Sequence, residues 1–293
     1  MKFHQNSEIL LTAGLDKKLR LFTVSDEPSK IQSIYFSDMP IFAAEYINDG
    51  TEIICTGNRK HMYSYSLLKQ IPEKIIPKYA SDIKDLKNLS ISCDGMNYAL
   101  STDTGLIHVH DSKTKMLLYD IKVNGRIASV KFPERAELII AEGVDGNIWS
   151  IDRRTRKCVS SMMDDGVISC TTVGISSRYY GSGCSSGAVN IYNCTNGKLE
   201  EKPIKQILNL TTKISGVVFN SESEICAIYS RWKKNSLKLV HMASMTVYSN
   251  FPSFKSNLKY VTALDYSKGS GYMCVANDTG RALLYKLPHY ICT

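Results

Sequence analysis

The sequence predicts an all-β fold, a single seven-bladed β-propeller that spans residues 1–293. Two observations predict it. A tight turn recurs at nearly constant spacing, and short runs of β-branched, aromatic and aliphatic residues lie on both sides of each turn. The last repeat is the clearest, because Val261–Tyr266, Tyr272–Ala276 and Arg281–Leu287 are three such runs. A meander of three strands leaves apolar side chains on both faces, so it needs neighbours like itself.

The recurring turn marks seven repeats. The intervals between consecutive marker residues are 42, 45, 42, 40, 47 and 46 residues. One four-stranded propeller blade takes roughly 40–45 residues, so each interval fits one blade. The markers are Asp16, Asn58, Asp103, Asp145, Ser185, Trp232 and Asp278.

The strands can be placed in chain order. The first blade is expected to be incomplete at the N-terminus, because Met1–His4 resembles only the end of an inner strand; the chain would then be a fragment of a longer protein. Residues 70–88 carry two prolines and mixed charge, so they are expected to form a longer connection on the rim. The other predicted strands are Ile9–Ala13, Leu19–Val24, Ile41–Ile47, Glu52–Thr56, His61–Tyr65, Leu89–Ile91, Asn97–Ser101, Leu106–His110, Ile127–Phe132, Glu137–Glu142, Asn147–Ile151, Val167–Val173, Arg178–Gly183, Ala188–Tyr192, Ile214–Phe219, Ile225–Ser230 and Ser236–His241.

Composition narrows the class of protein. Hydrophobic residues make up 43% of the chain, which is enough for a sizeable core, and no apolar run approaches the roughly 18 residues that span a bilayer. The N-terminus lacks the pattern of a secretory signal, and the nine cysteines form no C-x-x-C pair, so we expect a reducing compartment, cytosol or nucleus. The net charge of +8 is compatible with an acidic partner such as RNA but is too small to demonstrate one.

Motifs for catalysis are weak. Gly183–Gly187 matches the G-x-S-x-G nucleophile elbow, but that motif needs a helix after it, and here a β run follows, so a hairpin turn is predicted. No phosphate-binding loop, H-E-x-x-H pattern or zinc-type His and Cys spacing occurs. The recurrence of Asp16, Asp145 and Asp278 at one turn position indicates a structural role. The sequence therefore predicts no enzyme, no catalytic residue, no metal and no cofactor.

Basic clusters are the remaining candidate sites. One group occupies the turn between the second and third strands and should emerge on one face, where its cations could attract phosphates and its Trp could stack a base. An acidic protein surface is an equally open partner, and solvated hairpin tips are the ordinary alternative. A second group lies between a third and a fourth strand, hence on the opposite face. The first group is Lys17, Lys18, Arg59, Lys60, Arg231, Trp232, Lys233 and Lys234, and the second is Arg153, Arg154, Arg156 and Lys157.

Period and turns make the chain resemble a degenerate WD40 propeller. The Trp-Asp signature at the third strand is replaced in every repeat, for example by Tyr65-Ser66, Ile151-Asp152 and Tyr285-Lys286. These departures put in doubt the Asp-His-Ser/Trp hydrogen-bond network of many WD40 blades. Packing is therefore expected to hold the blades together.

Longer stretches resemble the U3 small nucleolar RNA-associated protein 18 family. They come from both ends and the middle of the chain, more weakly across residues 67–130. They are LLTAGLDKKLRLF (10–22), IQSIYFSDMPIFAAEY (31–46), Gly57-Asn-Arg-Lys followed by YSY at 63–65, ILNLTTKISGVVFN (207–220), LKLVHMASMTVYSNFP (237–252) and GRALLYKLPHY (280–290).

This resemblance implies a place in the small-subunit processome of the nucleolus. Members of the family join a subcomplex of several propellers that associates with the U3 small nucleolar ribonucleoprotein on pre-ribosomal RNA and supports maturation of 18S rRNA. The family also carries a long N-terminal extension that reaches other factors, including the exosome-associated helicase, and that recruitment is not assigned to these residues. The implied partners are other WD40 propeller proteins, the U3 particle and, directly or indirectly, pre-ribosomal RNA, with no membrane and no small-molecule substrate.

Two other classes of function stay open. A propeller enzyme, a hydrolase or lyase, would need acids or histidines that converge on the central channel, and the turn-position aspartates do not meet that requirement. A peptide- or protein-binding WD40 adaptor outside ribosome assembly would show an aromatic or acidic ring at the channel mouth.

Overall fold

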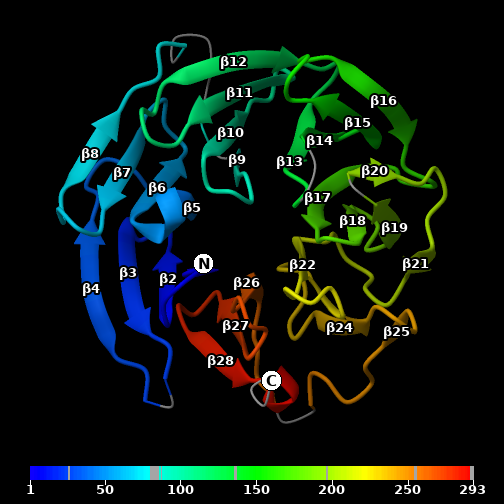
Figure 1. Cartoon of the computed structure of the whole chain (residues 1–293). Coiled ribbons are helices and arrows are strands. Elements are labelled where there is room, and N and C mark those ends of the chain that lie inside the picture. Colours follow the sequence, from blue (N-terminus) through cyan, green and yellow to red (C-terminus); the bar gives the residue numbers. More distant parts are fainter. Residues whose placement is uncertain are drawn as a thin grey trace. The chain divides into compact units, whose positions relative to one another are not determined.

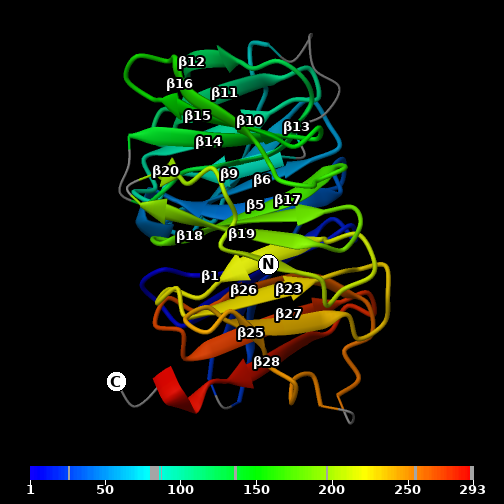
Figure 2. The same cartoon turned by 90° about the vertical axis from the view of Figure 1, so that its right-hand side faces the viewer.

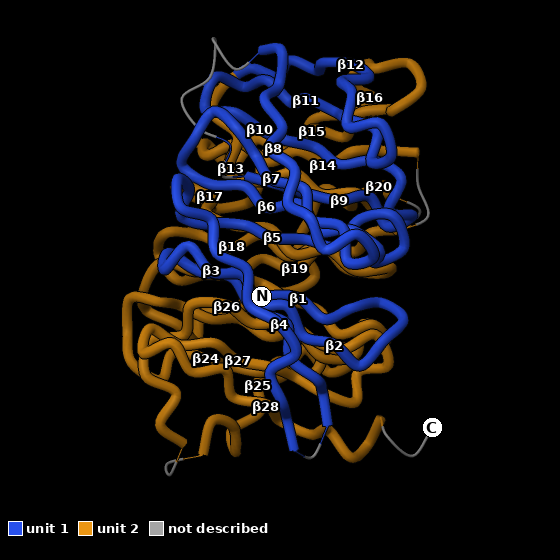
Figure 3. Tube along the Cα trace, turned by 90° about the vertical axis from the view of Figure 1, so that its left-hand side faces the viewer, with its two compact units in different colours: residues 1–124 blue, residues 125–293 orange. Residues whose placement is uncertain are grey.

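The computed structural model describes residues 1–25, 27–79, 86, 88–134, 137–195, 197–253 and 256–290. Their regular structure is almost entirely β-strand, arranged in seven small antiparallel sheets (Figures 1 and 2). The fold is a seven-bladed β-propeller, as the sequence predicts. By internal contacts the chain divides into two compact units, residues 1–124 with three blades and residues 125–293 with four (Figure 3). The expectation of a single domain therefore stays a prediction.

The first unit contains blades one to three. Blade one starts with a strand of two residues, and the expectation that this blade is incomplete stays a prediction. A single 3-10 turn, η1 (Asn48–Gly50), joins two strands of blade two. The strands are β1 (Lys2–Phe3), β2 (Ile9–Ala13), β3 (Lys18–Thr23), β4 (Lys30–Tyr35), β5 (Ile41–Ile47), β6 (Glu52–Gly57), β7 (Met62–Ser66), β8 (Pro72–Ile75), β9 (Asn88–Ile91), β10 (Asn97–Ser101), β11 (Leu106–Asp111) and β12 (Leu117–Lys122).

The second unit contains blades four to seven. In blade five the place of the fourth strand is shared by β20 and β21, which both pair with β19, and blade seven has three strands in the described residues. The strands, with the 3-10 helix η2 (Pro288–Tyr290), are β13 (Ile127–Lys131), β14 (Leu138–Gly143), β15 (Asn147–Asp152), β16 (Cys158–Met163), β17 (Cys170–Ile175), β18 (Tyr179–Cys184), β19 (Val189–Thr195), β20 (Lys198–Leu199), β21 (Lys205–Ile207), β22 (Gly216–Phe219), β23 (Ile225–Tyr229), β24 (Leu237–His241), β25 (Thr246–Val247), β26 (Val261–Tyr266), β27 (Tyr272–Asn277) and β28 (Ala282–Lys286).

Burial explains which strands could be recognised in the sequence. The second strand of a blade, such as β14 or β18, is buried along almost its whole length, so its sequence is a near-continuous run of apolar and small residues. The fourth strands β4, β8, β12 and β16 are mostly exposed, so no buried face imposes a hydrophobic pattern on their sequences. The expectation that residues 70–88 form only a connection is wrong in part, because β8 lies there and pairs with β7. Residues 80–85 and 87 lie outside the described residues.

The core consists of one apolar cluster between each pair of successive blades within a unit. In the first unit, one cluster joins blades one and two, and another joins blades two and three. In the second unit, three clusters lie between blades four and five, five and six, and six and seven. Blades two, five and six therefore bury both faces against neighbours in their own unit, as stacked repeats do.

A β-bulge between the first and second strands repeats in several blades. In four blades the pairing of the first and second strands shifts by one residue, a β-bulge at Phe42, Ala128, Thr171 and Thr262. At the bulge of blade five, the Thr171 hydroxyl donates to the carbonyl of Ile214 in the next blade's first segment at 2.7 Å. Such bonds fix the spacing between neighbouring blades.

Within the described residues, no helix is long and apolar enough to cross a membrane. The eight cysteines that the structure describes are all free thiols.

Candidate functional site

The marker turns predicted from the sequence join the second and third strands of the blades. The carboxylates of Asp16 and Asp145 each accept the amide N–H two residues later, at 3.3 Å. The carboxylate of Asp278 accepts the amide N–H of Tyr260 at 3.2 Å. The structural role predicted for these aspartates is confirmed.

The first unit carries four of the candidate cations. Lys17 has a left-handed backbone, with φ of 62°, and its ammonium group donates to the carbonyl of Ser37 at 2.8 Å. Lys18 is the exposed first residue of β3. Arg59 and Lys60 are exposed in the turn between β6 and β7.

A carboxylate, Asp38, lies beside the residue that follows Arg59 and Lys60. Asp38 accepts hydrogen bonds from the hydroxyl of Tyr63 and the ammonium of Lys74, both at 2.7 Å, and His61 lies 3.3 Å away. The bonds from Lys74 and Tyr63 lower the pKa of Asp38 to about 2. The end of blade two therefore presents a mixed ion cluster rather than a purely basic patch.

The second unit carries the turn between β23 and β24, with Arg231, Trp232, Lys233 and Lys234. All four side chains are exposed, as predicted, and Trp232 keeps 57% of its surface in contact with solvent. The guanidinium carbon of Arg231 lies 5.2 Å from the centre of the Trp232 rings. The turn therefore presents a large exposed indole beside three cations. Exposed Trp residues are common in the hot spots of binding surfaces, so this turn is a candidate binding site.

The second basic group forms the turn between β15 and β16, at the end of β15 opposite its marker turn. The carboxylate of Asp152 accepts the amide N–H of Arg154 at 2.7 Å and that of Thr155 at 3.2 Å, and these bonds lower the pKa of Asp152. Arg156 is left-handed, with φ of 59°, and Arg153 lies with its guanidinium carbon 5.6 Å from the Phe132 ring. Lys157 is exposed at the end of the turn.

This turn is a repeated device of the fold. In blade three, Asp111 accepts the amide N–H of Thr114 at 2.8 Å, and Lys115 is left-handed with φ of 58°. The backbone of the two turns is thus the same, while the charge differs. The candidate cations are divided between the two units, so a single basic face across them stays a prediction.

The G-x-S-x-G match is a hairpin turn, as predicted. Ser185 lies between β18 and β19, its amide N–H donates to the carbonyl of Ser169 at 2.9 Å, and Gly187 has φ of 96°. A strand, not a helix, follows it, so the motif does not form a nucleophile elbow.

A buried polar network between blades four and five escaped the sequence analysis. Glu142 on β14 has no exposed surface, and its two carboxylate oxygens accept the hydroxyls of Tyr180 and Ser182, the latter at 2.6 Å. Burial, with the nearby charge of Asp164, raises the pKa of Glu142 to about 8. The one available signal was a glutamate inside the apolar run 138–143.

The same interface holds a second buried carboxylate. Asp164 accepts the hydroxyl of Tyr192 at 2.5 Å and the side-chain amide of Asn190 at 2.8 Å. The expectation that packing alone holds the blades is therefore wrong at this interface, where other residues replace the WD40 network. Because these groups are sealed from solvent, they cannot meet a substrate.

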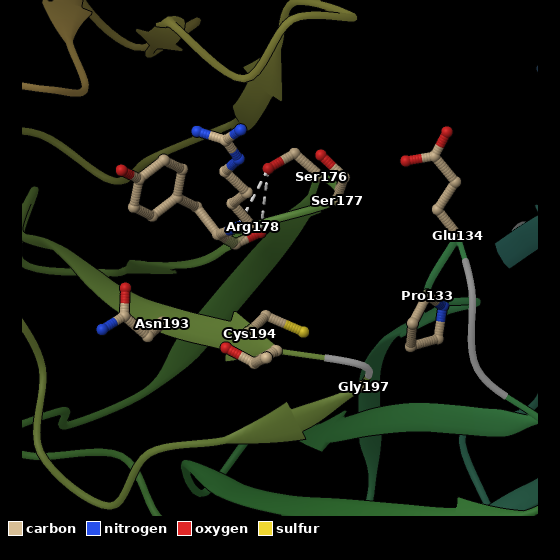
Figure 4. A pocket seen from close by; sticks show the side chains of 10 residues that line it. Pro133, Glu134, Ser176, Ser177, Arg178, Asn193, Cys194 and Gly197 are labelled. Atoms are coloured by element: carbon tan, nitrogen blue, oxygen red, sulfur yellow. Dashed lines mark hydrogen bonds between the residues drawn. The ribbon is translucent and has the colours of Figure 1, made fainter.

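A cavity of about 410 Å³ opens between blades four and five (Figure 4). Arg178 and Glu134 supply its charges, and the hydroxyl of Ser176 is engaged by its own turn, where it accepts the amide N–H of Tyr179 at 3.0 Å. Among the described residues that line it there is no histidine, and no nucleophile pairs with a base. Across the described part of the chain, no group of three or more His, Cys, Asp or Glu could hold a metal ion.

Comparison with known proteins gives the family. No protein-family model matches the chain. The chain is 40% identical to the U3 small nucleolar RNA-associated protein 18 homolog of Arabidopsis thaliana, over 98% of its own length and 54% of the relative's. It is 36% identical to the human homolog, over 99% of the chain and 53% of the relative. The chain is a homologue of the U3 small nucleolar RNA-associated protein 18 family.

The likeness extends to a distant fungal member. U3 small nucleolar RNA-associated protein 18 of Saccharomyces cerevisiae is 25% identical over 99% of the chain and 57% of its own length. The resemblance inferred from the residues is thus confirmed. The chain spans about half the length of the curated relatives it matches.

Proposed function

We propose that this chain is a non-catalytic scaffold of the nucleolar small-subunit processome. In this role it associates with the U3 small nucleolar ribonucleoprotein and supports processing of pre-ribosomal RNA to 18S rRNA and biogenesis of the small ribosomal subunit. The observation that carries the proposal is homology, over nearly the whole propeller, to proteins named for association with U3 small nucleolar RNA. The location that follows is the nucleus, in the nucleolus.

The geometry supports a scaffold more than an enzyme. The buried carboxylates Glu142 and Asp164 are sealed inside a blade interface, and the cavity beside Arg178 holds no nucleophile with a base among its described residues. Short, fully paired strands make a stiff framework, and the turns at their ends are free to vary in charge. The partners we propose are other WD40 propellers of the subcomplex, the U3 particle and pre-ribosomal RNA.

The basic turns are the proposed docking sites. In the first unit they are Lys17, Lys18, Arg59 and Lys60; in the second they are the turn at Trp232 and the turn at Arg154. Exposed cations at these positions attract phosphate groups or acidic protein surfaces.

Co-purification tests the proposal. The tagged chain, expressed in cells and recovered under gentle conditions, should bring down U3 RNA and processome propellers in excess over an unrelated seven-bladed propeller used as control. Recovery of a defined set of proteins without U3 RNA or processome components would favour the alternative, an adaptor outside ribosome assembly.

A further inference from the structure

We propose that the second unit binds single-stranded RNA at one surface of blade six, with an unpaired base stacked on Trp232 and the neighbouring phosphates held by lysines. That the RNA comes from a pre-ribosomal transcript rests on the proposed function, whereas the chemistry of binding is argued from the structure alone. We call this the blade-six surface. It consists of Lys213, Arg231, Trp232, Lys233, Lys234, Lys259 and Tyr260.

Hydrogen bonds hold the three segments of this surface together. The hydroxyl of Ser230 donates to the carbonyl of Lys213 at 2.6 Å, and the amide N–H of Arg231 donates to the hydroxyl of Ser215 at 3.1 Å. On the other side, the amide N–H of Asn235 donates to the carbonyl of Lys259 at 2.8 Å. The cations are therefore brought close together before any ligand arrives, which lowers the entropy cost of binding.

The surface carries more positive than negative charge. Lys213, Arg231, Lys233, Lys234 and Lys259 are all exposed, and none of these five forms an ion pair with a carboxylate among the described residues. The carboxylate of Asp278 borders the surface, where it accepts the amide N–H of Tyr260 at 3.2 Å. A cluster with an excess of cations attracts a polyanion.

The aromatic residues decide between RNA and an acidic protein. The ring of Trp232 is 57% exposed beside the guanidinium of Arg231, and the ammonium of Lys234 lies 5.9 Å from the Tyr260 ring centre. Lysines alone would satisfy an acidic peptide, whereas alternating aromatic rings and cations match the alternation of bases and phosphates. The bases of a duplex are already stacked, so the accessible indole favours a single strand.

Fluorescence anisotropy of a labelled single-stranded oligoribonucleotide of about ten nucleotides measures the affinity of the whole chain. Trp232→Ala should weaken binding about 5- to 150-fold, the range that removal of one base–aromatic stack produces. Trp232→Phe should restore most of the affinity. In a Trp149→Phe background, Trp232 is the only tryptophan, so its emission should be quenched as RNA binds.

The lysines give a second, independent readout. Lys233→Gln with Lys234→Gln should reduce the slope of log affinity against log salt by about 1.4, since each phosphate contact on a single strand contributes about 0.7. The matched control is Lys202→Gln with Lys205→Gln, which removes the same charge from two exposed positions of blade five outside the proposed docking sites and should leave the slope unchanged.

Two results would overturn the inference. One is RNA affinity that does not change in Trp232→Ala, with thermal unfolding confirming that the variant is folded. The other is a polyglutamate peptide that binds the same lysines as tightly as RNA and independently of Trp232, which would assign the surface to an acidic protein. Recovery of U3 RNA by the tagged Trp232→Ala chain separates the two proposals, because it would uphold the assembly role even if direct RNA binding fails.

Discussion

Replacing Glu142 by Gln should remove a pH-dependent destabilisation of the folded protein. The carboxyl group of Glu142 is fully buried between blades four and five, where it meets two hydroxyls and lies near a second buried carboxylate, Asp164. Desolvation disfavours the ionised form, and so does the charge of Asp164. Gln has the shape of the protonated acid and keeps both oxygen and N–H groups for hydrogen bonding, but it cannot ionise.

The sign follows from proton binding. Burial raises the pKa of Glu142 from 4.5 to about 8. Between these two pH values the folded chain holds a proton that the unfolded chain has released, so the free energy of unfolding falls as pH rises and levels off above pH 8. At about 1.4 kcal/mol per pH unit the full effect is about 5 kcal/mol. Because relaxation of the surroundings lowers the cost of a buried charge, we expect roughly 2 to 5 kcal/mol of it to be measured.

Urea unfolding, followed by tryptophan fluorescence at pH 5.5, 7 and 8.5, gives the free energy of unfolding of each protein. The Glu142→Gln variant should match the wild type near pH 5 and become progressively more stable than it at higher pH. Glu137→Gln is the control, since Glu137 is exposed just before the same strand. Curves for wild type and Glu142→Gln that stay parallel from pH 5.5 to 8.5 would refute the reasoning.

Three further changes test other parts of the fold. Lys74→Gln should raise the pKa of Asp38 from about 2 toward its ordinary value, because it removes the largest stabilising bond; NMR titration of the carboxyl group measures this, and an unchanged value would contradict it. Gly187→Ala should have a lower midpoint of urea unfolding than Gly280→Ala. Both glycines have positive φ, but only at Gly187 would the new methyl group meet a neighbouring carbonyl oxygen, at 2.5 Å. Equal urea midpoints for the two variants would contradict this. Thr171→Val should lower the free energy of unfolding by about 1 kcal/mol through loss of the bond to the next blade, and a neutral effect would show that bond to be dispensable.

The sequence was sufficient to predict the strands that are buried and the turns between them. The second strands carry near-continuous runs of apolar and small residues because both their faces are covered, and several of the turns carry a Gly with positive φ, such as Gly105, Gly146, Gly187 and Gly280. The fourth strands escaped because they lie at the rim: β16 (Cys158–Met163), for example, is exposed at nearly every position. An edge strand without a buried face carries no regular hydrophobic period to detect.

The sequence could predict which turns carry exposed charge, but not which distant residues join them in one surface. The turn at Trp232 is recognisable from four consecutive residues, but Lys213 and Lys259 lie about 20 residues away on either side and join it through hydrogen bonds from Ser230 and Asn235 that the local sequence does not predict. The role of Glu142 depends on Tyr180 and Ser182, nearly 40 residues further along the chain. Such partners are set by tertiary packing and have no local pattern.

The repeats differ in sequence although they share one fold, and a single physical reason explains this. A blade interface requires partners for most buried polar groups, but it does not require the same partner in every blade. Between blades two and three, the side-chain amide of Asn48 donates to the carbonyl of Ser112 at 3.2 Å; between blades six and seven, that of Asn220 donates to the hydroxyl of Ser270 at 3.2 Å. Each interface has thus reached its own solution.

Stability and partner recognition therefore depend on different residues. Substitutions at the interfaces must come as matched pairs or networks, since an orphaned buried group costs about 1–3 kcal/mol. Exposed turn positions such as those of Lys233 and Arg154 have no side chain in a blade interface, so they can change charge one residue at a time. We therefore expect substitutions that alter partner choice to fall on these turns, with little change in the free energy of unfolding, and substitutions that unfold the chain to fall on groups such as Glu142 and Thr171.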